Sequence, residues 1–388
     1  MQITQRLSAL QASPTAQVKR VADQLKKEGV QVFDFGVGEP DFPTPEPIKQ
    51  AACAALEHNR TTYTAARGIL ELRQAVADKY NLAYKTHFGP ENVVISVGAK
   101  QALYNLMQAL VEPGDEVLIP APFWVTYPAQ VQLASGTTKV LPLKAKDAFQ
   151  LSAADVAAHL GPRTKVINLN SPCNPSGAVI PQAELEKITA LAAEKKVPLI
   201  YDECYEKFVY GVPHANPLQW DQDNVIVVGS ASKTYAMTGW RIGWAIGPQE
   251  VIAATDRLQS QSTSNPTSIA QWAVVEALRG DQAPVQAMQE EYARRRTFVL
   301  ETLANIPRLS CAVPQGAFYV FPDVSAFFNE DVPDSVALAK HLLERAHVAV
   351  VPGSAFGAEG YVRISYAAPL DVLKEGLNRV AQALGELV

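Results

Sequence analysis

Four side chains that could take part in catalysis stand at or just after the ends of short apolar segments: an amide, a carboxylate, a phenol and an amine, at Asn174, Asp202, Tyr205 and Lys233. A carboxylate at the end of a buried strand needs a cationic partner, such as a protonated pyridine nitrogen, because burying an unpaired charge is costly. A lysine that loses its water shell supplies an amine for Schiff-base chemistry. Each residue also has a plainer interpretation, since Asp202 could cap a helix and Lys233 could lie at the surface.

Groups that suit a phosphate dianion lie in the neighbouring segments. The hydroxyls of Ser230 and Ser232 and the guanidinium of Arg241 could each bind phosphate oxygens. The backbone N–H groups of Ala99 and Lys100 stand where an expected strand meets a helix, and a helix N-terminus binds anions. The sequence therefore predicts an anion site formed by these segments. The segment at Ala99 and Lys100 could also serve only to begin a helix.

An aromatic ring and an arginine complete the set of candidate groups. Trp124 follows an expected strand and could stack on a planar ring or pack in the core. Arg363 lies in the middle of the apolar segment 361–365, where it needs an anion. That anion could be a structural Asp or Glu, or a substrate carboxylate bound by two parallel hydrogen bonds. A metal site has no support, because the sequence contains neither HExxH nor CxxC.

The elements that must position these groups alternate between short β-branched apolar segments and helical patterns. The expected strands are 93–97, 116–120, 139–143, 165–170, 197–202 and 225–230, with an antiparallel edge strand at 241–247. Strands that are apolar along their whole length indicate a mostly parallel α/β sheet covered by helices on both faces. Ligands of such sheets bind outside the carboxyl ends of the strands, so we expect the candidate groups to converge there.

The pattern changes after Pro314 and indicates a smaller α+β domain. It comprises expected strands at 317–321, 348–351 and 361–365 and helices at 335–345 and 369–387. A further helix is expected at 15–28, before Gly29.

Composition excludes several classes of function. The chain has 388 residues, 34 basic and 39 acidic, with a net charge of −5 and no basic block, so nucleic acid is not an expected partner. No apolar run approaches the roughly 20 residues that span a bilayer, and the N-terminus lacks the apolar region of a signal peptide. We therefore expect a cytoplasmic protein that acts on small molecules and does not bind membranes.

Three short motifs suggest other chemistry, and each is incomplete. Residues 36–41 begin like a dinucleotide fingerprint, but Asp41 replaces the third glycine and Pro40 blocks the helix. Residues 230–233 match the S-x-x-K pattern of acyl-enzyme nucleophiles, yet no Lys-Thr-Gly follows. The same segment lacks the glycine that precedes the lysine of a P-loop.

The segments NSPCNPSG, DECYEKFVYG, SASKTYAMTGWRIGW and YVRISYA, in this order, resemble class I, fold-type I pyridoxal-phosphate aminotransferases. The segments GEPDFPTP, YTAARGILELR, GAKQALYNL, PAPFWVTYP and VPGSAFG are similar to the bacterial aspartate aminotransferase subgroup in particular. The resemblance spans nearly the whole chain. It departs at Cys173, Ser176 and Cys204, which neighbour functional positions and so bear on fine tuning.

The resemblance implies a role in cofactor binding for most candidate residues. Lys233 would bind pyridoxal 5'-phosphate covalently and transfer the substrate proton, and Asp202 would pair with the protonated ring nitrogen. Tyr205 and Asn174 would bind the phenolic oxygen of the ring, on which Trp124 would stack. The phosphate group would be bound by Ser230, Ser232, Arg241, the backbone of Ala99 and Lys100, and Tyr63 of a second subunit.

The resemblance also implies how substrate is bound. Arg363 would bind the α-carboxylate, assisted by the backbone of Gly38, with Trp124 and Asn174 beside it. The ammonium of Lys100 would lie near a distal carboxylate, and Thr15 would approach the same end from the small domain. In the plainer interpretation, Lys100 is solvated and Thr15 caps its helix.

The implied activity is ping-pong transfer of an amino group between an amino acid and a 2-oxo acid. We expect aspartate and glutamate as donors and oxaloacetate and 2-oxoglutarate as acceptors; aromatic substrates or prephenate are the alternative. A more distant alternative is a different pyridoxal-phosphate activity, or a non-enzymatic regulator, on the same fold. The resemblance further implies a homodimer with shared active sites, a large domain at 46–285, and a small domain formed by 1–45 and 286–388.

Overall fold

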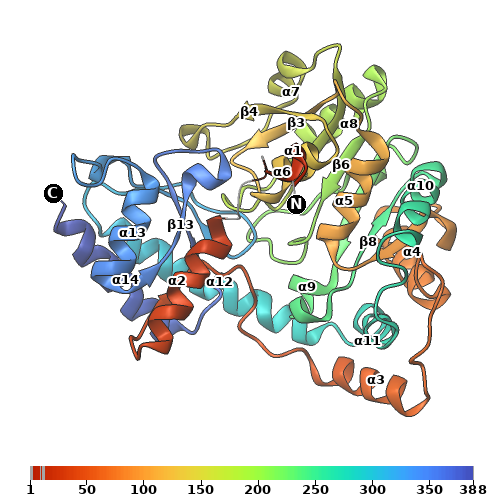
Figure 1. The fold of residues 1–388 in the computed structure, drawn as a ribbon, viewed down its shortest axis with the longest axis horizontal. Helices are drawn as coiled ribbons and strands as arrows, with labels where there is room; N and C mark the ends of the chain where they lie inside the picture. Colours follow the sequence, from red (N-terminus) through yellow and green to blue (C-terminus); the bar gives the residue numbers. More distant parts are fainter. Residues whose placement is uncertain (1–2, 9, 11–13, 388) are drawn as a thin grey trace.

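The computed structural model describes residues 3–8, 10 and 14–387. Its main feature is a seven-stranded sheet in the order β2-β8-β7-β6-β5-β3-β4 (Figure 1). Strand β8 is antiparallel to both of its neighbours, and the other strands share one direction, which confirms the predicted mostly parallel sheet. The strands are β2 (Val93–Ser96), β3 (Glu116–Ala121), β4 (Thr137–Pro142), β5 (Thr164–Asn170), β6 (Leu199–Asp202), β7 (Val225–Ser230) and β8 (Gly243–Ile246).

The position of β8 corrects one expectation. We expected residues 241–247 at an edge of the sheet, but β8 lies inside it, between β2 and β7. All four residues of β8 are buried, and both of its edges are paired, which suits a strand with no polar side chain. The short connection from β7 predicted the antiparallel pairing, whereas no local signal indicated that β2 pairs on the far side.

Helices cover both faces of the sheet, as the uniformly apolar strands predicted. Apolar side chains of α5, α6 and α10 pack on one face, and those of α4, α8 and α11 pack on the other. The helices of this part are α3 (Glu46–Glu57), α4 (Leu70–Tyr84), α5 (Ala99–Leu110), α6 (Thr126–Leu133), α7 (Ala153–His159), α8 (Gln182–Lys195), α9 (Ala231–Thr234), α10 (Gln249–Ser260) and α11 (Ser268–Arg279).

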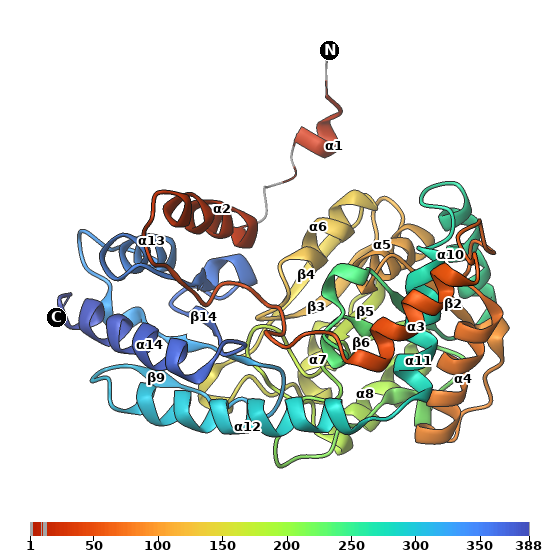
Figure 2. The same cartoon turned by 90° about the horizontal axis from the view of Figure 1, so that it is seen from below.

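A second group of elements combines both ends of the chain. Strand β1 pairs in parallel with β12, and β14 lies between β10 and β13. The long helix α12 runs beneath both groups (Figure 2). These elements are α2 (Pro14–Lys27), β1 (Phe33–Asp34), α12 (Ala283–Ala304), β9 (Ser310–Cys311), β10 (Tyr319–Val320), β11 (Pro322–Asp323), α13 (Ser335–Ala346), β12 (Val348–Ala349), β13 (Val351–Pro352), β14 (Val362–Ser365) and α14 (Leu370–Gly385). The short helix α1 (Gln5–Ser8) instead lies near α6.

None of the described helices combines the length and the hydropathy that a membrane span requires.

The contact between β8 and the start of α5 depends on a glycine. Gly243 pairs with Ser96 and Ser230, the last residues of β2 and β7. A Cβ atom at Gly243 would lie 2.3 Å from the backbone nitrogen of Ala99 and 2.6 Å from the carbonyl carbon of Gly98. Backbone atoms cannot rotate away as a flexible side chain can, so the first turn of α5 requires glycine at this position.

We therefore expect Gly243→Ala to lower the free energy of unfolding by roughly 1–3 kcal/mol, the usual cost of overpacking. Gly239→Ala is the matched control, because a Cβ atom there would meet no atom within 4 Å, and it should change stability by about 0.5 kcal/mol or less. Urea denaturation of both variants measures the difference. Equal stability of the two variants would contradict the packing argument.

Candidate active site

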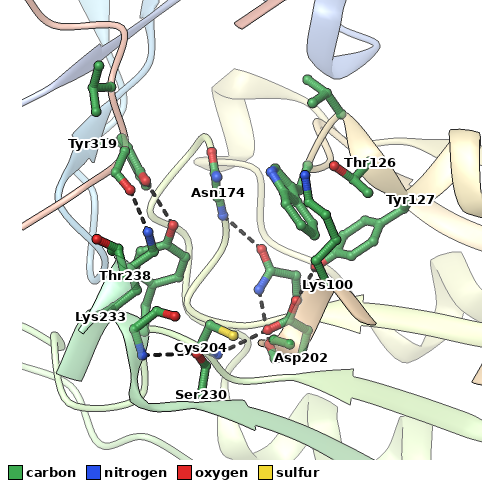
Figure 3. Close-up of a pocket in the computed structure, with 18 of the residues that line it drawn as sticks. Lys100, Thr126, Tyr127, Asn174, Asp202, Cys204, Ser230, Lys233, Thr238 and Tyr319 are labelled. Atoms are coloured by element: carbon green, nitrogen blue, oxygen red, sulfur yellow. Dashed lines mark hydrogen bonds between the residues drawn. The ribbon is translucent and has the colours of Figure 1, made fainter. Parts of the chain in front are cut away.

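A cavity of about 410 Å³ lies at the carboxyl ends of β5, β6 and β7, whose last residues Asn170, Asp202 and Ser230 line it (Figure 3). Among the predicted site residues whose side chains the structure describes, all except Tyr63 lie together in this cavity. They are Gly38, Ala99, Lys100, Trp124, Asn174, Asp202, Tyr205, Ser230, Ser232, Lys233, Arg241 and Arg363. The expected convergence at this edge of the sheet is therefore observed.

Asp202 is a buried carboxylate whose hydrogen-bond donors among the described residues are uncharged. Its side chain is 3% exposed. The hydroxyl of Tyr127 donates to Oδ2 at 2.7 Å, and the backbone N–H of Cys204 donates to Oδ1 at 3.0 Å. Burial raises the pKa of Asp202, and these two hydrogen bonds offset only part of that effect. A cationic nitrogen within the cavity would complete the stabilisation of the charge.

Lys233 carries the amine that could react in this cavity. It lies in α9, whose N-cap residue Ser230 accepts a hydrogen bond from the backbone of Ser232. The Lys233 Nζ atom donates to the carbonyl oxygen of Gly38 at 2.5 Å. Burial lowers the pKa of Lys233 to about 8, and the neighbouring charge of Arg363 acts in the same direction. The neutral, nucleophilic form is therefore accessible near physiological pH.

The start of α5 and the loop before β8 form a cradle for an anion. Gly98, the N-cap residue of α5, has no side chain that could accept hydrogen bonds from the first turn of the helix. The backbone N–H groups of Ala99 and Lys100 are therefore available to an anion. A Cβ atom at Gly98 would lie 2.4 Å from Nη2 of Arg241. The hydroxyls of Ser230 and Ser232 line the same cavity. A helix N-terminus, a guanidinium and two hydroxyls suit a phosphate dianion.

Arg363 is a buried guanidinium whose observed partners are neutral. It is 3% exposed in β14. Its Nη1 atom donates to Oδ1 of Asn174 at 2.9 Å, and its Nη2 atom donates to the carbonyl oxygen of Gly36 at 2.5 Å. Among the described residues its buried Nε atom has no hydrogen-bond partner. Of the two anions that the sequence left open, a ligand carboxylate therefore fits this site better than a structural Asp or Glu.

Two tyrosines of the cavity were missed from the sequence. Tyr127 donates to Asp202, and Tyr319 shares a 2.8 Å hydrogen bond with the hydroxyl of Tyr205. Tyr127 stands three residues after Trp124, and their rings make an edge contact at 5.4 Å, so helical spacing could have linked them. Tyr319 lies in an apolar strand, where sequence gives no indication that a tyrosine faces a cavity rather than the core.

The remaining predicted residues differ in how well they are placed. Tyr63 is 91% exposed and does not line the cavity of its own chain. Thr15 is the second residue of α2, but its side chain lies outside the described residues, so its predicted contact stays a prediction. Lys100 is exposed, yet its Nζ atom lies 4.9 Å from the ring centroid of Trp124. The partial burial of its ammonium group, and then the charge of Arg241, lower the pKa of Lys100.

Comparison with known proteins gives consistent matches. A family profile described as aminotransferase class I and II matches residues 30–383. The aspartate/prephenate aminotransferase of Thermus thermophilus is 42% identical over 99% of this chain and 99% of its own, and the aspartate aminotransferase of Geobacillus stearothermophilus is 38% identical over 98% of each. The solved aspartate aminotransferase from Thermus thermophilus with maleate has a TM-score of 0.95 and 42% identity over 99% of this chain and 100% of that one.

The lowered pKa of Lys233 predicts a specific pH dependence. The neutral amine reacts with aldehydes, so modification of Lys233 should slow about tenfold for each pH unit below 8 and level off above about pH 9. Reductive methylation followed by peptide mass spectrometry measures this rate in the protein without added ligand. Exposed Lys374 in the same samples is the internal control for general lysine reactivity. A midpoint for Lys233 near the ordinary lysine value of about 10.4 would contradict the effect of burial.

Proposed function

Because this chain belongs to the class I and II aminotransferase family, it is a pyridoxal 5'-phosphate-dependent aminotransferase, and we propose that aspartate or glutamate is its amino donor. The proposed acceptors are 2-oxoglutarate and oxaloacetate. The observation that carries the proposal is that three groups share one cavity: the reactive amine of Lys233, the incompletely stabilised carboxylate of Asp202 and the guanidinium of Arg363, whose partners are neutral.

The cavity fits the cofactor in three respects. Asp202 requires a positive partner, the start of α5 with Arg241 suits an anion, and Lys233 supplies an amine in the same cavity. When bound, pyridoxal 5'-phosphate supplies a carbon that carries the amino group and a ring that accepts electrons. In this proposal Asp202 holds a proton on the ring nitrogen, and the amine of Lys233 binds the cofactor and then moves the proton at the substrate Cα.

Asn174 connects the proposed cofactor site to the proposed substrate site. Its Oδ1 atom accepts a hydrogen bond from Arg363, and its backbone N–H donates to Oδ1 of Asn170. Its amide nitrogen can then donate to the phenolic oxygen of the cofactor ring, together with the hydroxyl of Tyr205. The indole of Trp124 covers the ring, and the hydroxyls of Ser230 and Ser232 bind the phosphate group.

Substrate selection is assigned to two cationic side chains. Arg363 binds the α-carboxylate through its guanidinium, beside the backbone of Gly38. Lys100, whose amine lies over Trp124, binds the distal carboxylate of a dicarboxylic substrate, and Thr15 approaches the same end. Prephenate is the second candidate acceptor, because relatives that share 42% and 40% of their residues with this chain are named aspartate/prephenate aminotransferases.

We also propose a domain division and a homodimer. The pairing of β1 with β12 supports a small domain made of 1–45 and 286–388, beside a large domain at 46–285. Tyr63 is 91% exposed, which suits a residue that completes the phosphate site of a second subunit. Cytoplasmic location stays a prediction that cell fractionation tests.

Half-reactions test the proposed donors and acceptors. Purified protein that contains the cofactor should lose its near-visible absorbance when aspartate is added, with one oxaloacetate formed per site, because the amino group moves to the cofactor. Adding 2-oxoglutarate should restore the absorbance. Restoration by prephenate as well would extend the acceptor range. A response only to amino acids without a second carboxylate would contradict the proposal.

Asp202→Asn should bind the cofactor but turn over at least about 10²-fold more slowly. The amide cannot keep the ring nitrogen protonated, and loss of one preorganised electrostatic contact costs about 2.7–4 kcal/mol in comparable sites. Steady-state kinetics on aspartate, with cofactor content measured by absorbance, check this. Turnover within threefold of the native protein would mean that Asp202 has only a structural role.

Lys100→Ser should lower kcat/KM for aspartate, because the substitution removes a hydrogen bond between charged groups. The expected loss of transition-state stabilisation is roughly 1.5–3 kcal/mol. The backbone N–H at this position remains, so cofactor affinity should not change. Alanine and phenylalanine, which lack a distal carboxylate, are the matched control substrates and should react as before. A parallel loss for all substrates would place the Lys100 side chain in the phosphate site instead.

A further inference from the structure

The turn after β6 presents side chains to two different environments. Asp202 and Tyr205 line the cavity, whereas Glu203 lies between them in sequence and does not line it. Glu203 is nonetheless 1% exposed. Its backbone N–H donates to the carbonyl oxygen of Val228 at 3.0 Å, so the pairing with β7 continues past the end of β6. Glu203 therefore points into the protein interior on the side away from the cavity.

The carboxylate of Glu203 accepts hydrogen bonds from three side chains, one in a helix and two in a loop. The hydroxyl of Tyr80 in α4 donates to Oε1 at 2.6 Å. His214 Nε2 and Asn216 Nδ2, both from the loop after the turn, contact Oε2 at 2.9 and 2.7 Å. The Tyr201 hydroxyl donates to the carbonyl oxygen of Ala215 at 2.9 Å and so fixes that loop. Three donors on one carboxylate fix the direction of the side chain.

An ion pair extends this cluster. Glu206, one turn further along, forms a salt bridge with Lys79. The ammonium of Lys79 lies 5.3 Å from the ring centroid of Tyr80 and 5.2 Å from that of Trp244. The indole N–H of Trp244 in β8 donates to the Tyr80 hydroxyl at 3.1 Å. Helix α4, strand β8 and the turn after β6 are thus joined through buried polar groups.

The electrostatics of the cluster keep Glu203 in its charged, accepting form. Burial alone raises the pKa of Glu203. The hydrogen bond and charge of His214, the charge of Lys79 and the hydrogen bond from Tyr80 together lower this pKa by more than burial raises it, so the net shift is downward. A carboxylate can accept from all three donors, whereas a neutral amide presents N–H groups to at least one of them.

We propose that Glu203 is a positioning residue for the reaction, which holds Asp202 and Tyr205 at the cofactor ring from the opposite side of the turn. This inference rests on the roles proposed above for Asp202 and Tyr205. The turn between them is short, so a shift at Glu203 must move at least one of the two side chains. Displacements of about 1 Å in catalytic groups can cost on the order of 10²-fold in rate.

Glu203→Gln tests the proposal, because it keeps the size of the side chain and removes the charge. We expect kcat for aspartate to fall roughly 10-fold to 100-fold with KM changed less than about threefold. We also expect a shift in the absorbance and circular dichroism of the bound cofactor. Tyr80→Phe removes one of the three donors and should give a smaller change in the same direction. It also provides a test if Glu203→Gln does not fold.

Thr189→Val is the matched control for loss of a buried hydrogen bond. Thr189 is 1% exposed and donates to the carbonyl oxygen of Leu185 within α8. It should affect thermal stability without changing the cofactor spectrum or kcat. If Glu203→Gln and Tyr80→Phe likewise lower stability but leave the spectrum and kcat within twofold, Glu203 is only structural. Asp202→Asn, measured in parallel, distinguishes failure of the proposed function from failure of the role proposed for Glu203. A large effect of Asp202→Asn on kcat, with no effect of Glu203→Gln, overturns only the role of Glu203.

Discussion

The buried carboxylate of Asp202, whose hydrogen-bond donors in the described part of the chain are all uncharged, is the constraint around which the rest of the site is organised. A charge at the end of an apolar strand is tolerated only if a partner completes its stabilisation. The other charged side chains that line the cavity among the described residues are all cationic: Lys100, Lys233, Arg241 and Arg363. A cofactor with a protonated ring and a phosphate dianion, together with a substrate carboxylate, therefore has charges opposite to those of the cavity. The ring would face Asp202, the phosphate Arg241 and the carboxylate Arg363.

The fold supplies these groups from distant parts of the chain. Parallel strands place Asn170, Asp202 and Ser230 at one edge of the sheet, because their carboxyl ends must meet there. The substrate end is built differently, since the contact between Arg363 and Gly36 joins residues 327 positions apart. Closure of that contact requires β14 and the N-terminal segment to pack together, so specificity depends on the association of both ends of the chain.

Sequence reasoning succeeded where a local pattern had a single structural consequence. Uniformly apolar strands predicted the sheet, and polar residues at their ends predicted the cavity. It failed where the answer depended on pairing between distant segments, as for the position of β8 inside the sheet. Tyr127 and Tyr319 were missed because a tyrosine next to apolar residues is as common in a core as in a site. The predicted role of Thr15 rests on a side chain that lies outside the described residues, and that of Tyr63 rests on a second subunit.

The buried carboxylate of Asp202 should pair with a protonated ring nitrogen of the cofactor. Nitrogen-15 NMR of the protein loaded with cofactor labelled at the ring nitrogen observes that atom directly. We expect the chemical shift of a protonated pyridine ring, retained at pH values where the free cofactor has lost this proton. A shift typical of a neutral ring nitrogen at neutral pH would contradict the account.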